Sequence, residues 1–238
     1  MKKLPSFIKN NKVFFFFIFL LFVFRGAIAD WHPVPTGSMK PTILEGDVIW
    51  ANKMAYDLQI PFTDISLLRT GEPKRGDIVV FTSQVAQKRL IKRLIGLPGD
   101  IIKIQRNNLI INGNIVDYDI TDKIIPERES DKESGQEEVI YALESYKDME
   151  PHAVIIKDRK SVYPLAFNIP ECMEVKEEVV PEDHYFFLGD NRDNSADSRC
   201  IGYVPRSEIR AHATRILLSL NKNDNYKPRF ERFLEKLD

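Results

Sequence analysis

The chain opens with one continuous apolar run and then changes to short apolar segments separated by turn residues. Residues 13–24 read VFFFFIFLLFVF and contain no polar side chain. An uninterrupted run of this kind is typical of a membrane-directed segment, whereas short β-branched runs bounded by Gly, Pro, Asn and Asp are typical of strands. We therefore expect a membrane-directed N-terminus followed by a mainly β region.

Seven segments after residue 30 carry the strand pattern: 47–50, 77–81, 90–97, 101–104, 109–111, 154–156 and 184–188. Asn112-Gly113 predicts a tight hairpin turn between 109–111 and 115–116, because this pair readily adopts positive φ angles. Helical signals are confined to the end of the chain, at 205–220 and 228–237. The sequence therefore predicts a mainly β fold with two C-terminal helices.

Charge orients the apolar run. Four lysines precede it and Arg25 follows, so residues 1–25 carry +5 and the remainder, by difference from the net −1, carries −6. Basic flanks stay on the cytoplasmic side, so the rest of the chain is expected outside. Twelve residues are short for a span, and Ala27-Ile28-Ala29 offers a small-x-small cleavage pattern, which favours a cleaved signal peptide. A retained anchor reaching Ala29 is the alternative, with Arg25 extending to the interface.

Composition excludes several classes. The 238 residues carry 34 basic and 35 acidic side chains, which argues against a nucleic-acid partner, since such proteins normally have a basic excess. Four scattered histidines leave little for a metal site, and none is expected. Two cysteines exclude a disulfide-dense scaffold. Cys172 and Cys200 could form a bridge or remain thiols, and the sequence leaves both possibilities open.

An acidic stretch interrupts the strand pattern. Residues 117–150 hold twelve acids and four bases with few aliphatic residues, which is typical of a solvated or mobile excursion. We therefore expect one β core with a large insertion. The predicted boundaries are an N-terminal tip and membrane segment at 1–29, the first part of the core at 30–104, a variable insertion at 105–180, and the second part of the core with the C-terminal helices at 181–238.

The first candidate for chemistry is the serine in Pro35-Thr36-Gly37-Ser38-Met39-Lys40-Pro41-Thr42. Prolines stiffen this loop, and Gly37 allows another backbone to approach Ser38 closely. An exposed serine beside a backbone N–H and the Thr36 hydroxyl fits a nucleophile with an oxyanion site. The spacing matches neither G-x-S-x-G nor S-x-x-K. A plain polar turn is the competing interpretation.

A serine nucleophile needs a base, and Lys92 is the best candidate. In a strand over 90–97 it shares a face with Leu90 and Leu94, which would bury it among apolar side chains. Burial would lower its pKa from about 10.4 toward the ~7–8 that suits a general base. A lysine that protects a strand edge from aggregation is an equally good interpretation of the pattern alone. Lys40 lacks an apolar face and is the weaker candidate.

The third candidate is the loop from Gly189 to Arg199, which is dense in turn-forming and charged residues. Its alternating oxygen side chains suggest a calcium loop, but Ser198 occupies the glycine position and Val204 the position of the final acid. A buttress formed by Asp197 and Arg199 fits better, with Ser195 available to hold a lysine amine.

Four blocks occur in order along the chain: Thr36–Thr42, Arg75–Val79, Lys92–Asp100 and Gly189–Arg199. Together they resemble type I signal peptidase (leader peptidase), the Ser/Lys-dyad enzyme that removes signal peptides from exported proteins. The blocks cover most of the chain beyond the apolar run. The resemblance implies a mainly β catalytic core with a second, variable β region, preceded by one transmembrane helix.

The resemblance also implies a role for each matching residue. Ser38 matches the nucleophile and Lys92 the general base, and the Thr36 hydroxyl with the Ser38 N–H would bind the oxyanion. Ser195 matches the hydroxyl that orients the base, and Asp197 with Arg199 the supporting salt bridge. No cofactor is implied. The positions that match pockets for small substrate side chains are Val34, Met39, Ile43, Leu90 and Ile91.

The expected function is therefore a membrane-bound serine endopeptidase that removes N-terminal signal peptides from exported preproteins. A peptidase dedicated to one pilus or conjugation precursor is an alternative, and a non-catalytic peptide-binding β domain is an alternative of another class. The expected partners are secretory preproteins and membrane lipids, with the translocon as a further candidate. Substrates held at a membrane favour a tethered enzyme, so the apolar run becomes a retained anchor.

Under this interpretation the protein is a single-pass protein of the bacterial inner membrane, with a cytoplasmic N-terminus and the catalytic domain on the periplasmic face. Many Gram-negative members of the family carry two spans, and this sequence offers one candidate.

Overall fold

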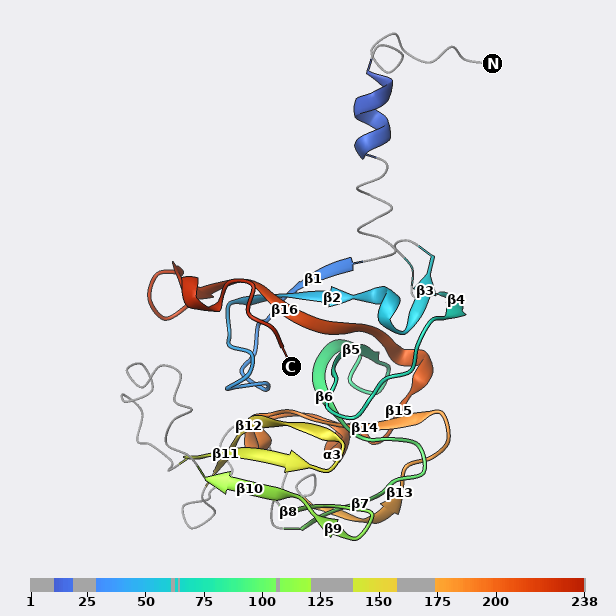
Figure 1. Ribbon diagram of the computed structural model, residues 1–238, viewed down its shortest axis with the longest axis vertical. Coiled ribbons are helices and arrows are strands. Elements are labelled where there is room, and N and C mark those ends of the chain that lie inside the picture. Colours follow the sequence, from blue (N-terminus) through green and yellow to red (C-terminus); the bar gives the residue numbers. More distant parts are fainter. Residues whose placement is uncertain are drawn as a thin grey trace.

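The computed structural model describes residues 11–18, 29–60, 63, 65–105, 108–120, 139–157 and 174–237, and these residues form a mainly β protein (Figure 1). A helix over residues 12–18 projects from one end of the β body. Within the described ranges, no helix is both long and apolar enough to cross a membrane. Residues 19–28, which complete most of the predicted membrane segment, lie outside the description, as does Cys172.

Eight antiparallel strands build the main sheet, in the order β1-β2-β16-β5-β6-β14-β15 with β17 beside β16. The strand pattern of the sequence predicts four of them, β2, β5, β6 and β14. Their bounds are β1 Ala29–Pro33, β2 Asp47–Asn52, β5 Ile78–Ser83, β6 Lys88–Gly96, β14 His184–Leu188, β15 Val204–Pro205, β16 Ile209–Asn221 and β17 Lys227–Pro228.

Two further sheets are formed by the segment between β6 and β14, and they lie together at the other end of the molecule from the N-terminal helix (Figure 1). One has the order β10-β11-β12 and the other β13-β7-β8-β9. Their bounds are β7 Ile101–Gln105, β8 Asn108–Ile111, β9 Asn114–Ile115, β10 Asp117–Ile120, β11 Val139–Tyr146, β12 Met149–Lys157 and β13 Val175–Val179. Because β7 pairs with β8 and β13, this region begins before the predicted boundary at residue 105.

A short hairpin and five short helical elements complete the described structure. The hairpin pairs β3 with β4 near one end of the main sheet (Figure 1). The bounds of these elements are β3 Asp57–Gln59, β4 Ser66–Arg69, η1 Lys53–Ala55, η5 Arg192–Asn194, α3 Ser198–Ile201, η6 Arg206–Glu208 and η7 Phe230–Arg232.

All seven predicted strands are confirmed within a few residues. The predicted hairpin is confirmed as well: Asn112 and Gly113 have φ angles of 52° and 76° and connect β8 to β9. Positive φ at both positions is the geometry that a two-residue turn between antiparallel strands requires.

The two predicted C-terminal helices are wrong. Residues 209–221 form β16, a central strand between β2 and β5, and the helical structure in residues 228–237 is limited to the short η7 turn. Ile209, Ala211 and Ala213 are buried alternately, and register shifts after Ala213 then interrupt this period of two. These bulges give the apolar positions a spacing that resembles a helix in sequence.

The acidic stretch is also more ordered than predicted. Both of its described ends are strands, β10 and β11, and they pair with each other in antiparallel register. Glu144 on β11 is completely buried, so the acids do not all face solvent. Residues 121–138 of the stretch lie outside the description.

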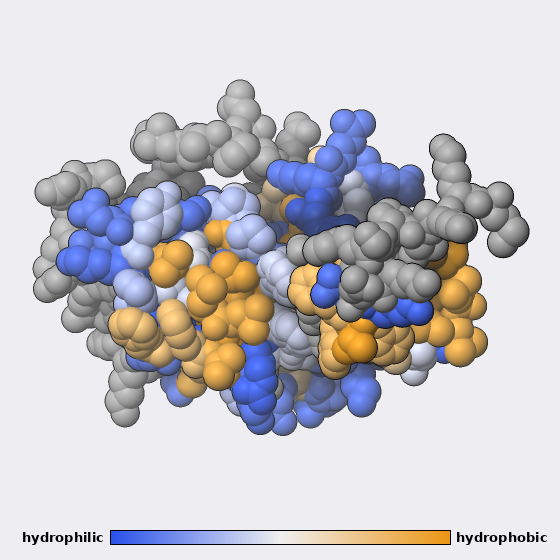
Figure 2. Space-filling view, turned by 90° about the horizontal axis from the view of Figure 1, so that it is seen from above, coloured by the Kyte–Doolittle hydropathy of each residue, from blue (hydrophilic) through white to orange (hydrophobic). Residues whose placement is uncertain are grey.

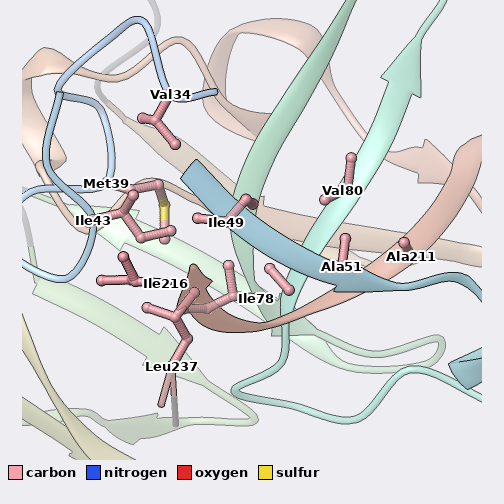
Figure 3. Packing of buried hydrophobic residues seen from close by; sticks show 11 residues of the cluster. Val34, Met39, Ile43, Ile49, Ala51, Ile78, Val80, Ala211, Ile216 and Leu237 are labelled. Atoms are coloured by element: carbon pink, nitrogen blue, oxygen red, sulfur yellow. The ribbon is translucent and has the colours of Figure 1, made fainter. Parts of the chain in front are cut away.

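Three buried apolar clusters hold the fold together. The first lies between β2, β5 and β16 and includes Val34, Met39 and Ile43 from the loop before β2 (Figure 3). The second packs the inserted region against β6 and β14, and the third packs β5, β6 and β14 on the opposite face of the main sheet from the first. The loop that carries Ser38 is therefore anchored by its apolar side chains in the core of the main sheet.

The central position of β16 makes a measurable prediction. Ile216 is fully buried in the first cluster, so Ile216→Ala should lower the free energy of unfolding by about 2–5 kcal/mol. Ile115 on β9 is 67% exposed, so Ile115→Ala should change it by less than about 0.5 kcal/mol. Denaturant unfolding of the two variants checks this. Equal effects would contradict the placement of Ile216 in the core.

Candidate active site

Ser38 lies in the loop that connects β1 to β2, and this loop is fixed at both ends. Val34 N–H donates to Asp47 O at 2.8 Å, and Gly46 N–H donates to Val34 O at 3.1 Å. Inside the loop, Ile43 N–H donates to Met39 O at 2.9 Å. Backbone hydrogen bonds and buried side chains therefore hold the serine in one position.

Lys92 reaches this loop from the middle of β6. Its Nζ lies 2.5 Å from Ser38 Oγ and 3.1 Å from Ile91 O. Val79 faces it across the ladder, and Leu94 follows two residues later on the same strand face, as the alternation predicts. The structure thus joins the two candidate residues of the sequence, which are separated by 54 positions.

Burial changes the acidity of Lys92. Lys92 is only 2% exposed, and desolvation of its charged form lowers its pKa to about 8. Lys88 and Arg199 lower it further, whereas Asp197 and Asp190 act in the opposite direction. Because Lys92 is buried and its Nζ contacts Ser38 Oγ, the alternative of an exposed lysine that protects a sheet edge is wrong. A substantial share of neutral amine at physiological pH is what a general base needs.

Two residues that the sequence did not single out, Asn191 and Asp190, hold the loop of Ser38 in place through hydrogen bonds. Asn191 N–H donates to Ser38 O at 3.2 Å, and its Nδ2 donates to Gly37 O at 3.0 Å. Asp190 Oδ2 accepts the Thr42 hydroxyl at 2.5 Å. The density of polar residues in the loop from Gly189 to Arg199 marked this segment, but not which members touch the serine loop.

Asp190 is itself fixed by a buried ion pair. The Arg93 guanidinium donates to both carboxylate oxygens, at 3.0 and 2.9 Å, and both side chains are almost completely buried. Burial opposes ionisation of Asp190, but Arg93 more than offsets it and holds its pKa below the ordinary value. Arg93 directly follows Lys92 on β6. Its ion pair therefore holds the loop that carries Asp190 beside the part of β6 that carries Lys92.

Ser195 lies beside the nucleophile loop, and its hydroxyl oxygen is buried. A Cβ on Gly189 would lie 2.2 Å from Ser195 Oγ and 2.4 Å from Ser38 O, so only glycine fits at position 189. Across the described residues, Ser195 Oγ makes no hydrogen bond to Lys92 and is a buried hydroxyl without a partner within bonding geometry. The predicted contact between Ser195 and Lys92 is therefore not formed.

Asp197 and Arg199 form the ion pair that the sequence suggests. Arg199 Nε and Nη2 each lie 2.8 Å from the Asp197 carboxylate, which also accepts Gly189 N–H at 2.9 Å. Burial opposes the ionisation of Asp197, but the charge of Arg199 and the hydrogen bonds to the carboxylate together outweigh it, so the pKa is lowered. Arg199 Nη2 also donates to Arg192 O. The pair and its bonds to Gly189 and Arg192 thus connect the beginning of the loop to its end.

The remaining predicted residues divide between two places. Thr36 lies two residues before Ser38 and is exposed. Val34, Met39 and Ile43 belong to the first apolar cluster, and Ile91 packs against it. Leu90 instead packs against the third cluster on the other face of the main sheet. Four of the five predicted pocket residues therefore lie together and Leu90 lies apart.

This arrangement can perform acyl transfer: a serine hydroxyl in contact with a buried amine of lowered pKa, beside backbone N–H groups and an exposed hydroxyl. Known proteins are similar to this chain over almost its whole length. The family model for signal peptidase, peptidase S26, matches residues 7–218. Signal peptidase I of Buchnera aphidicola subsp. Acyrthosiphon pisum is 33% identical over 255 aligned residues, covering 95% of this chain and 80% of that protein.

Signal peptidase I of Rickettsia prowazekii is 38% identical over 218 residues, covering 87% of this chain and 78% of that protein. A crystal structure of a signal peptidase I from Enterococcus faecalis is 26% identical, with a TM-score of 0.32, and the match covers 60% of this chain and 97% of that one. The family match extends from the N-terminal segment through the Ser38 loop, β6 and the loop that holds Asp197. The chain therefore belongs to the signal peptidase family, peptidase S26.

Proposed function

We propose that this chain is a membrane-bound serine endopeptidase that removes N-terminal signal peptides from exported preproteins and cleaves after small residues. The observation that carries the proposal is the 2.5 Å contact between Ser38 Oγ and the buried Lys92 Nζ. It occurs in a chain of the signal peptidase family, whose relatives above are named signal peptidase I.

In the proposed mechanism, neutral Lys92 takes the proton of Ser38 as the oxygen attacks the scissile carbonyl. The negative oxygen of the tetrahedral intermediate is bound by the Ser38 N–H and the Thr36 hydroxyl. The lysine then protonates the leaving amine, which frees the mature protein. Lys92, neutral again, activates a water molecule that hydrolyses the acyl enzyme and releases the signal peptide.

The loop from Gly189 to Arg199 supports this dyad. Ser195 would orient the Lys92 amine, and its buried hydroxyl, which is without a hydrogen-bond partner in the described structure, is available for that bond. The Asp197–Arg199 pair holds the backbone around Ser195 in place. This role requires a movement that brings the two side chains into hydrogen-bonding contact, since they do not bond in the present arrangement.

The substrate would lie as an extended strand beside β6, with its scissile bond at Ser38. Its small side chains would enter pockets at the surface of the first cluster, lined by Val34, Met39, Ile43 and Ile91. These residues are already closely packed, so little volume is left for a substrate side chain. Close packing favours small residues before the cleavage site. Leu90 would contact the substrate from the opposite face of the strand.

The alternatives explain less. A non-catalytic peptide-binding domain has no use for a buried lysine in contact with a serine, since an unpaired buried amine is costly to maintain. A peptidase dedicated to one pilus or conjugation precursor would use the same dyad, but the relatives named above are signal peptidase I. The general signal peptidase is therefore the favoured proposal.

The N-terminal segment is proposed to be a retained single anchor in the bacterial inner membrane, with the catalytic domain on the periplasmic face. Seen from the end that carries the N-terminal helix, the protein shows patches of apolar surface (Figure 2). Exposed apolar side chains occur in the elements drawn toward that end in Figure 1, namely β1, β4 and the η7 turn: Trp31, Leu67, Leu68 and Phe230. These residues suit contact with membrane lipids. The translocon remains a further candidate partner.

Removal of either member of the dyad should abolish cleavage. Ser38→Ala and Lys92→Met should each lower kcat/KM for a preprotein at least about 10³-fold, since the serine and its base act as a unit. Lys40→Met removes a lysine that lies in the loop of Ser38 but has no part in the mechanism, so this variant should cleave normally. Gel analysis of preprotein cleavage by the folded variants checks this. Near-normal activity of Ser38→Ala or Lys92→Met would refute the dyad.

The rate should increase with pH. Only neutral Lys92 accepts a proton, and its pKa is about 8, so the neutral fraction rises with pH below this value and levels off above it. We expect kcat/KM to rise about tenfold from pH 6 to pH 7, to reach half of its maximum at about pH 8 and to level off above about pH 9. A pH-rate profile with a neutral peptide substrate measures this. A flat profile between about pH 6 and 9 would contradict a lysine base.

The anchor should survive in the mature protein. N-terminal sequencing of protein recovered from membranes should start at or near Met1, because a tether keeps the enzyme near its substrates. The chain should remain in the membrane fraction after a high-salt wash, which releases proteins held only by charge. A mature chain that starts at Asp30 would show that Ala27-Ile28-Ala29 is a cleavage site and that the segment is not an anchor.

A further inference from the structure

The inserted β region touches the catalytic machinery through the backbone of the loop that begins at Gly189. Ile155 on β12 donates its N–H to Asp190 O at 2.8 Å and forms a parallel bridge with Asn191. On its other side, Asn191 holds the carbonyls of Gly37 and Ser38. The Asp190–Asn191 pair therefore lies between the inserted region and the nucleophile.

A buried ion pair reinforces this contact. Glu144 on β11 accepts hydrogen bonds from both terminal nitrogens of Arg192, at 2.5 and 2.8 Å. Glu144 is 0% exposed. Burial opposes its ionisation, but the charge and hydrogen bonds of Arg192, together with His152 and Tyr118, outweigh this and lower its pKa. Arg192 Nε also donates to Gly189 O at 3.2 Å, so this guanidinium bends the loop around Asp190 and Asn191.

Two more side chains of the inserted region complete the cluster. Tyr118 Oη on β10 accepts a hydrogen bond from Arg192 Nη1 at 3.3 Å. His152 on β12 places Nε2 3.5 Å from Glu144 Oε1 and 3.9 Å from Asp190 Oδ1. Desolvation and then Arg93 lower the pKa of His152 to about 4, so it is neutral at physiological pH. The carboxylates of Glu144 and Asp190 are thus each matched by one arginine.

We propose that the inserted β region is part of the catalytic unit and that Glu144 is a positioning residue, acting through Arg192, Asp190 and Asn191 to fix Ser38 against Lys92. Without the Glu144 charge, Arg192 is a buried cation without its partner. The loop must then move to hydrate it, and Asn191 moves with it. A shift of about 1 Å at the nucleophile costs up to about a hundredfold in rate.

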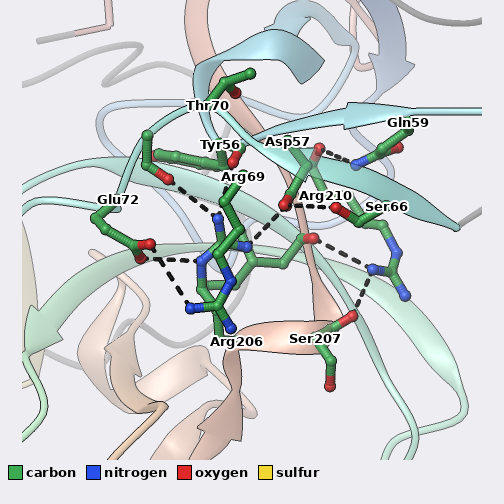
Figure 4. Close-up of polar contacts among 12 residues, drawn as sticks. Tyr56, Asp57, Gln59, Ser66, Arg69, Thr70, Glu72, Arg206, Ser207 and Arg210 are labelled. Atoms are coloured by element: carbon green, nitrogen blue, oxygen red, sulfur yellow. Dashed lines mark hydrogen bonds and ion pairs between the residues drawn. The ribbon is translucent and has the colours of Figure 1, made fainter.

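This inference rests on the proposed function, and a matched pair of variants tests it. Glu144→Gln removes the charge of a buried acid that is linked to the serine loop. Asp57→Asn removes that of another buried acid, which accepts Arg206 Nη1 at 2.7 Å (Figure 4). Arg206 also contacts Glu72 and the carbonyls of Tyr56 and Gly71, none of which lies in the loop of Ser38 or of Asn191. Asp57→Asn thus reports the cost of breaking a buried pair without moving the nucleophile.

The full chain is purified in detergent, and kcat and KM for preprotein cleavage are measured together with Tm. Glu144→Gln should lower kcat at least about tenfold with KM within about twofold of the parent. Asp57→Asn should lower Tm by about as much as Glu144→Gln does, and it should leave kcat within about twofold of the parent. A Glu144→Gln enzyme with the kcat of the parent overturns the inference, as does an equal fall in kcat in both variants.

A milder variant decides the matter where Glu144→Gln does not fold. Tyr118→Phe removes one hydroxyl that contacts Arg192 and should reduce kcat about threefold while Tm stays near that of the parent. An unchanged kcat in Tyr118→Phe would overturn the inference. Failure of the parent chain to cleave any preprotein is a different result, because it would refute the proposed function itself.

Discussion

The site depends on one constraint: removal of an amine from water destabilises its charged form. Lys92 is buried in the middle of β6, and this desolvation lowers its pKa to about 8 and leaves its nitrogen 2.5 Å from Ser38 Oγ. The same residue on an exposed edge would stay charged and could not act as a base. Burial of one lysine thus supplies what a histidine supplies in other serine hydrolases.

A buried base is useful only where the nucleophile is held against it, and most of the polar interior serves this purpose. Asn191 holds the carbonyls of the serine loop, Asp190 ties that loop to Arg93 on β6, and the Asp197–Arg199 pair closes the segment that carries both. Asp190 and Asp197 are each paired with an arginine, as a low-dielectric interior requires of buried carboxylates. The inserted region extends this framework through Glu144 and Arg192.

The sequence predicts those parts of the structure that local pattern determines. Short apolar segments between turn residues located seven of the described strands, Asn112-Gly113 located a turn, and ordered motifs brought Ser38 and Lys92 forward as partners across 54 positions. Where bulges alter the apolar spacing, as in β16, local pattern was misleading and predicted a helix. The contacts of Asn191 and Glu144 could not be predicted, because they depend on which distant segments meet in three dimensions.

A direct titration of the Lys92 amine tests the central claim. Protein labelled with ¹³C at lysine Cε can be followed by NMR as a function of pH, and Lys92→Met identifies the resonance. The structure predicts a pKa of about 8 for this amine, against 10.5 for an ordinary lysine. A Lys92 that titrates at or above 10.5 would be charged at physiological pH. That result would contradict a neutral base at Ser38 and with it the proposed chemistry.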